Sequence, residues 1–194
     1  MLFGGLVLAI FLVFIFLRGM VINRFKNSGF RKAWAPLIPM IQGKVVEDGG
    51  GAATSWLAGT YRGKRVRATM VPDRNRYSGE SGHRYNYFDV ALLDVRGKQD
   101  WKIEYQTAIL GFGQTGWRIV TQDKALEDRL NASGILHAIS RFGAPEITYS
   151  ARGGELQYSD DVTPLKAPPP ERLQEQLELL LVLAKVNEEV NAAA

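Results

Sequence analysis

The sequence contains no cysteine and only two histidines among its 194 residues. The absence of cysteine excludes disulfide bonds, thiolate metal ligands and cysteine nucleophiles. His83 and His137 are far apart in the chain, and no nearby carboxylates complete the three or four ligands that a zinc ion needs. A P-loop and a G-x-S-x-G nucleophile elbow are also missing. We therefore predict no metal, no cofactor and no catalytic residue, which favours a non-enzymatic protein.

Charge is missing from Leu2 to Leu17, where the side chains are almost all apolar. A helix needs about 20 mostly apolar residues to cross a bilayer. Arg18 can extend its charged end to the headgroups, so that the apolar residues up to Ile22 complete the span. A cleaved signal peptide would begin with positive charge, and none precedes this run. We predict that residues 1–22 form a single transmembrane helix that anchors the chain in a lipid bilayer.

Basic residues follow this predicted anchor, and no acidic residue occurs before Glu47. Positively charged flanks stay on the cytoplasmic side of a membrane. We predict a single-pass protein of the inner (plasma) membrane with its N-terminus outside and its C-terminal domain in the cytoplasm. Residues 23–42 are predicted to be a basic juxtamembrane linker. The candidate membrane-interface residues, at the end of the anchor and in this linker, are Arg18, Arg24, Lys26, Arg31, Lys32 and Trp34.

The charge balance differs between the two parts of the chain. Residues 1–85 contain 13 lysines and arginines against four acidic residues, whereas residues 86–194 contain 11 against 16. A nucleic-acid-binding protein concentrates positive charge on its folded domain. Here the positive charge lies nearest the anchor, which is typical of contact with anionic lipid headgroups. We therefore expect no nucleic-acid partner.

The remaining residues, 43–194, predict one soluble α+β domain with an antiparallel β-sheet, a short helical pair, a β-hairpin and a covering C-terminal helix. Arg62-Gly63 separates two alternating segments and predicts a tight hairpin. Asp123 is a plausible N-cap of the helical pair. Arg152-Gly153-Gly154 predicts a second hairpin. In the last segment, Leu173 to Val190, two neighbouring apolar rows predict a helix that covers the sheet.

Two motifs suggest chemistry but favour structural roles. Gly111 to Gly116 matches G-x-G-x-x-G, yet a β-branched stretch follows where a dinucleotide site requires a helix. The glycines are therefore predicted to form a hairpin turn. Asp160-Asp161 is a carboxylate pair whose members point to opposite faces of an extended chain, which favours a turn or a cap over a shared site.

The long polar segment between Pro72 and Tyr87 is the best candidate for a partner-binding surface. It mixes arginine with aromatic residues, the types that dominate binding hot spots, although a solvated loop fits the pattern equally well. The candidate partner-binding residues are Arg74, Arg76, Tyr77, His83, Arg84, Tyr85 and Tyr87.

Three functional hypotheses follow from these features. The first is a non-catalytic accessory or scaffolding subunit whose cytoplasmic domain docks on other subunits of a membrane complex, for example a respiratory or photosynthetic one. The alternative is a membrane-tethered domain that binds a lipid or small ligand in a pocket between sheet and final helix. The third is an enzyme of unrecognised type, in which carboxylates such as Glu104 or Asp123 would converge with an arginine or a histidine in a cleft. The runs Gly59–Val66 and Leu173–Val190 are similar to segments of small bacterial membrane-anchored proteins, without indicating a family.

Overall fold

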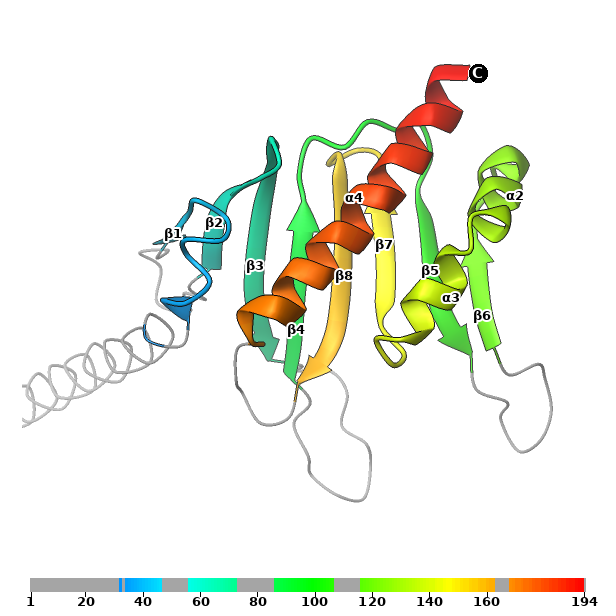
Figure 1. Cartoon of the computed structure of the whole chain (residues 1–194). Helices are drawn as coiled ribbons and strands as arrows, with labels where there is room; N and C mark the ends of the chain where they lie inside the picture. The colour runs from blue at the N-terminus through cyan, green and yellow to red at the C-terminus, as the bar shows by residue number, and fades with distance from the viewer. Residues whose placement is uncertain are drawn as a thin grey trace, which may run out of the picture.

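A computed structural model of the chain describes residues 32, 34–46, 56–72, 86–106, 116–162 and 168–193. Within these ranges the chain forms an α+β domain with one eight-stranded antiparallel sheet and a long C-terminal helix, which confirms the α+β class predicted for the domain (Figure 1). The elements are β1 (Lys44–Val46), β2 (Trp56–Tyr61), β3 (Lys64–Pro72), β4 (Asn86–Leu92), β5 (Trp101–Gln106), β6 (Gly116–Val120), α2 (Lys124–Ala132), α3 (Ile135–Ser140), β7 (Glu146–Ser150), β8 (Glu155–Val162) and α4 (Pro170–Ala193).

The strand order of the sheet is β1-β2-β3-β4-β8-β7-β5-β6. The β7–β8 hairpin lies between β4 and β5, so that these two sequential strands do not pair. After the edge strand β6 the chain forms the two short helices, α2 and α3. It then returns to the sheet as β7 and β8, which fill the space between β5 and β4. The predicted hairpins are therefore correct, but their arrangement brings β8 into the centre of the sheet.

The β2–β3 hairpin shows how local sequence positions these strands. Tyr61 pairs with Lys64 across a two-residue turn. Arg62 and Gly63 have φ angles of 48° and 80°, the left-handed pair that matches the twist of a hairpin. Along β3, Val66 and Met70 are buried and Arg67 is half-buried, so one face of the strand joins the core.

All three described helices cover the same face of the sheet (Figure 1). The predicted apolar rows of α4 are confirmed, because Leu173, Leu177, Leu180 and Leu183 are each 0% exposed. They pack with strand residues such as Phe88 in one hydrophobic core. Burying side chains of this size stabilises the fold by about 1.5–3 kcal/mol each. The side chains that alternate with these core residues along the same strands are mostly polar, and they lie on the opposite face of the sheet.

Residues 34–42 belong to this folded domain, although the sequence led us to place them in the juxtamembrane linker. Trp34 is 0% exposed, and Leu37 and Ile41 join it in the core. The candidate membrane-interface role of Trp34 is therefore corrected: its indole packs inside the protein. The close packing depends on Gly59, because a Cβ there would lie 2.3 Å from the Ile41 carbonyl oxygen.

Among the described residues no helix is both long and apolar enough to cross a bilayer. The predicted anchor, residues 1–22, lies outside the described ranges.

Candidate functional site

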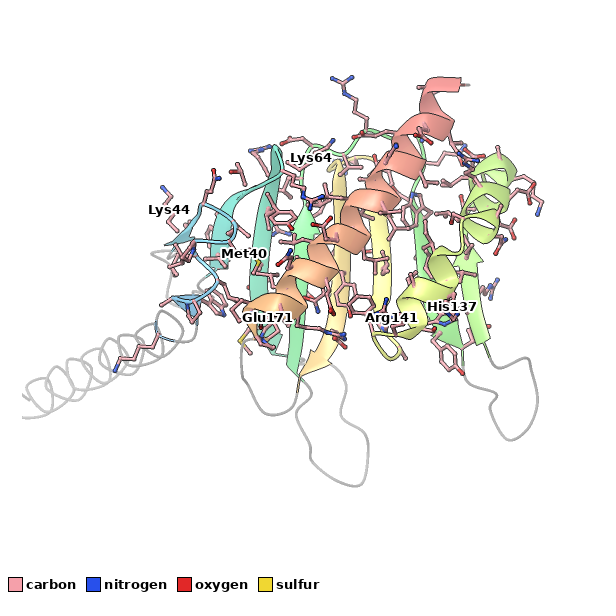
Figure 2. The ribbon with its side chains drawn as sticks, in the orientation of Figure 1. Met40, Lys44, Lys64, His137, Arg141 and Glu171 are labelled. Atoms are coloured by element: carbon pink, nitrogen blue, oxygen red, sulfur yellow. The ribbon has the colours of Figure 1, made fainter. Side chains whose placement is uncertain are left out.

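A groove of about 640 Å³ lies between α3 and the outer side of α4. Its size falls within the range of about 300–1,000 Å³ that is typical of binding sites. Glu171 at the start of α4 and Arg141 just after α3 mark its two sides (Figure 2). Its apolar lining consists of Ile135, Ala138, Phe142, Leu179 and Val182.

The short helix α3 forms one side of the groove. This helix has only six residues, Ile135–Ser140. Glycines at φ angles of 70° and 93°, Gly134 and Gly143, bracket it. Its buried residues, Ile135 and Ile139, hold it against the core. The outer side of α4 is not covered by this helix, and the apolar side chain of Val182 is 51% exposed.

Arg172 fixes the floor of the groove. Its Nη2 atom donates to the carbonyl oxygen of Phe142 at 3.0 Å and to Asp160 Oδ2 at 3.2 Å. Its guanidinium carbon also lies 4.4 Å from the centre of the Phe142 ring. The Tyr158 hydroxyl donates to Asp160 at 3.1 Å. Burial raises the pKa of Tyr158 above its ordinary value, so this hydroxyl stays protonated and donates to Asp160. The contacts of Arg172 hold Phe142 on the floor of the groove.

Acidic residues line the α4 side of the groove. Glu178 accepts a hydrogen bond from the Tyr61 hydroxyl at 2.6 Å and pairs with Arg62 at 2.7 Å. Burial, followed by the bond to Glu178, raises the pKa of Tyr61. Glu171 and Glu175 are exposed and form no ion pair with any described residue. The groove therefore combines an apolar floor with a negatively charged wall.

The opposite face of the sheet carries a second polar cluster on β3, β4 and β8. Arg67 donates to Glu155, and the Ser159 hydroxyl donates to Asp89 Oδ1 at 2.7 Å. Burial raises the pKa of Asp89, opposed by its bond to Ser159 and by the positive charge of Arg67. Gln157 donates to Ser159 at 3.0 Å. These groups satisfy one another across three strands, which is the pattern of a structural network.

The groups considered for catalysis do not converge. Glu104 forms an ion pair with Lys102 at 2.6 Å. Asp123 accepts from the Leu126 amide at 3.1 Å as the predicted N-cap of α2. His137 is exposed. In the described part of the chain no three histidine or acidic side chains come together as metal ligands.

Two motif predictions are resolved by the strands. Gly116 begins β6, so a strand rather than a helix follows the G-x-G-x-x-G run, as predicted; residues 111–115 lie outside the described ranges. Asp160 and Asp161 are not in a turn, contrary to our expectation. They lie within β8, because the pairing of β8 with β4 extends to Val162.

Most of the predicted site residues lie outside the described ranges. For the membrane-interface set, only Lys32, which is exposed, and Trp34, which is buried, are described. For the partner-binding set, Tyr87 pairs with Val71 and Asp161 in the sheet. The residues outside are Arg18, Arg24, Lys26, Arg31, Arg74, Arg76, Tyr77, His83, Arg84 and Tyr85.

Sequence reasoning missed the groove. One signal was present: Leu179 to Leu183 are five consecutive apolar residues in a helix. An α-helix turns by about 100° per residue, so such a run must place one side chain on the outer side. Val182 is that residue. Phe142 and Arg141 line the groove because of the way α3 packs against α4, and the local sequence does not show this packing.

No protein-family model, curated protein or solved structure matches this chain.

Proposed function

We propose that this chain is a non-catalytic accessory protein, anchored in the inner membrane, whose cytoplasmic domain docks on a protein of a larger membrane assembly through the α3–α4 groove. The observation that carries the proposal is the exposed apolar side chain of Val182 in a groove whose floor is already fixed by Arg172. A groove of this size with apolar side chains and a few charged groups in its lining is a candidate binding site.

The apolar run at the N-terminus and the basic residues after it support the attachment to the membrane. The position of residues 34–42 adds a geometric consequence. Since Trp34 and Ile41 are packed in the core, the chain leaves the domain at the β1–β2 side of the sheet (Figure 1). The domain would then be held close to the bilayer instead of hanging on a long tether.

A protein partner is better supported than a lipid or small ligand enclosed between sheet and helix. Phe88, Tyr158 and Leu177 are 0–1% exposed and occupy the space between the sheet and α4. The groove, by contrast, is open on the outer side of the two helices. An elongated surface segment of a partner fits that shape.

Affinity purification of the full-length chain from native membranes in mild detergent tests the proposal. We expect a stoichiometric partner with the wild type, and its loss with Val182→Glu, which places a charge on the apolar floor. Thr60→Glu is the matched control, because Thr60 is exposed and lies, with its cross-strand partner Arg65, on the face of the sheet that points away from the helices. A monodisperse lone monomer at native expression level would refute the proposed function.

Topology is tested separately. The protein should resist extraction by alkaline carbonate, and a C-terminal tag should be protected from protease added to intact cells. Extraction by carbonate, or digestion from outside, would contradict the membrane attachment or its orientation without bearing on the groove.

A further inference from the structure

Three acidic residues and Val182 form a straight row along the outer side of α4. Glu171, Glu175, Glu178 and Val182 are spaced by four, three and four residues. Residues with this spacing lie on one stripe of a helix, and 11 residues extend about 16 Å. All four line the groove. The row is therefore as long as about three turns of another helix lying beside α4.

This row is unfavourable in the isolated domain. Glutamates four apart on a helix repel each other by about 0.2–0.5 kcal/mol. Glu171 lies in the first turn of α4, where the helix dipole favours an acidic residue. That explanation does not extend to Glu175, which lies beyond the first turn and forms no ion pair with any described residue. A cation from outside the domain would remove the repulsion.

The apolar floor and the acidic wall together select the chemistry of the partner. Val182 and Phe142 offer apolar contact, and Glu171 and Glu175 offer unpaired negative charge beside them. Arg141 on the α3 side adds one positive charge. An amphipathic helix lays its apolar row into such a groove, while the charges on its flanks set its register and direction.

We propose that the groove binds a basic amphipathic helix of a partner protein, about three turns long. Its apolar side chains contact Phe142 and Val182, and two lysines or arginines, spaced by four residues, pair with Glu171 and Glu175. This inference rests on the proposed docking function and adds the charge and length of the docked segment.

Charge reversal at Glu175 separates this role from a structural one. Glu175→Lys removes the repulsion within α4 and so leaves the domain at least as stable as the wild type. It should nevertheless reduce the amount of captured partner about tenfold. Glu146→Lys is the matched control, because Glu146 is exposed on β7 and forms no ion pair with any described residue. Loss of stability in Glu175→Lys, or equal loss of partner with Glu146→Lys, would overturn the inference.

Site-specific photo-crosslinking in isolated native membranes identifies the occupant. A photo-reactive amino acid is installed in the full-length chain in place of Val182, and in place of Glu146 as the control. We expect a crosslink from position 182 to a partner segment with net positive charge and helical apolar spacing. Raising the ionic strength from about 0.15 to about 1 M shortens the Debye length from about 8 to about 3 Å and should weaken the crosslink.

The remaining outcomes are distinct. A crosslink to an acidic or uncharged segment would overturn the inference and leave the docking function standing. A crosslink to a second copy of this chain would show that the groove serves self-association and would overturn the inference. Absence of any crosslink above the control would show that the groove is not a binding site, and would overturn both the inference and the proposed mode of docking.

Discussion

Replacing Asn187 with leucine should destabilise the domain, because it removes two buried hydrogen bonds that link the C-terminal half of α4 to the segment between β4 and β5 and to β5 itself. Asn187 is 0% exposed. Its Oδ1 atom accepts from the indole nitrogen of Trp101 at 2.9 Å, and its Nδ2 atom donates to the Arg96 carbonyl oxygen at 2.8 Å. Leucine fills a similar volume but leaves both partners without a hydrogen bond.

The expected magnitude follows from those two partners. A buried polar group left unsatisfied costs about 1–3 kcal/mol. Two such groups, less the gain from burying leucine in place of an amide, give a net loss of about 2–4 kcal/mol. A domain of this size is stable by only about 5–15 kcal/mol. The substitution should therefore shift the urea midpoint clearly, without changing the slope of the transition.

The assay is urea unfolding of the full-length chain in mild detergent, followed by circular dichroism and tryptophan fluorescence. Asn131→Leu is the control, because Asn131 is exposed at the end of α2, and its effect should stay within about 0.5 kcal/mol. Combining Asn187→Leu with Trp101→Phe removes the orphaned indole donor. The double variant should then be more stable than additivity predicts, by about 1–2 kcal/mol.

Two results would refute this reasoning. An Asn187→Leu protein whose free energy of unfolding is within about 0.5 kcal/mol of the wild-type value would show that these two hydrogen bonds contribute little to stability. Strict additivity of Asn187→Leu and Trp101→Phe would show that the two side chains do not depend on each other. In either case the apolar face alone would hold α4.

Three further predictions concern the sheet. Gly59→Ala should cost at least about 2 kcal/mol and expose residues 34–43 to hydrogen exchange, because its Cβ would overlap the Ile41 carbonyl oxygen; unchanged protection there would contradict the packing. Gly63→Ala should cost about 1 kcal/mol in a thermal melt because of its φ angle of 80°, and a neutral effect would argue against the turn type. Burial raises the folded-state pKa of Asp89, so the folded state binds more protons than the unfolded state. The contribution of Asp89 to the free energy of unfolding therefore falls as the pH rises from about 4 through that pKa. Asp89→Asn should remove this fall, and a variant with the same pH–stability profile as the wild type would disprove it.

Local sequence was sufficient where the signal is contained in neighbouring residues. The Arg62-Gly63 turn follows from a two-residue link between alternating segments, and Asp123 is the N-cap because its carboxylate can reach the Leu126 amide. The apolar face of α4 follows from helical spacing alone. Such features depend on backbone preference and periodicity, which act over a few residues.

Features that depend on distant partners were not predictable in this way. Trp34 looked like an interfacial residue, because tryptophan after a basic segment is common there. Its burial depends on Gly59 and Gly43 permitting close approach of two backbone segments. The short strand β1 was missed for the same reason, since among the described strands it pairs with β2 alone.

The sequence by itself determined the α+β class of the domain, the hairpins and the covering helix, because these depend on composition and short-range pattern. It also excluded thiol chemistry, because it contains no cysteine. The tertiary structure alone decided that the β7–β8 hairpin enters the middle of the sheet and that α3 lies beside α4 with a groove between them. The groove results from that second arrangement. It is built from residues about 40 positions apart whose contact depends on long-range packing, which no local pattern encodes.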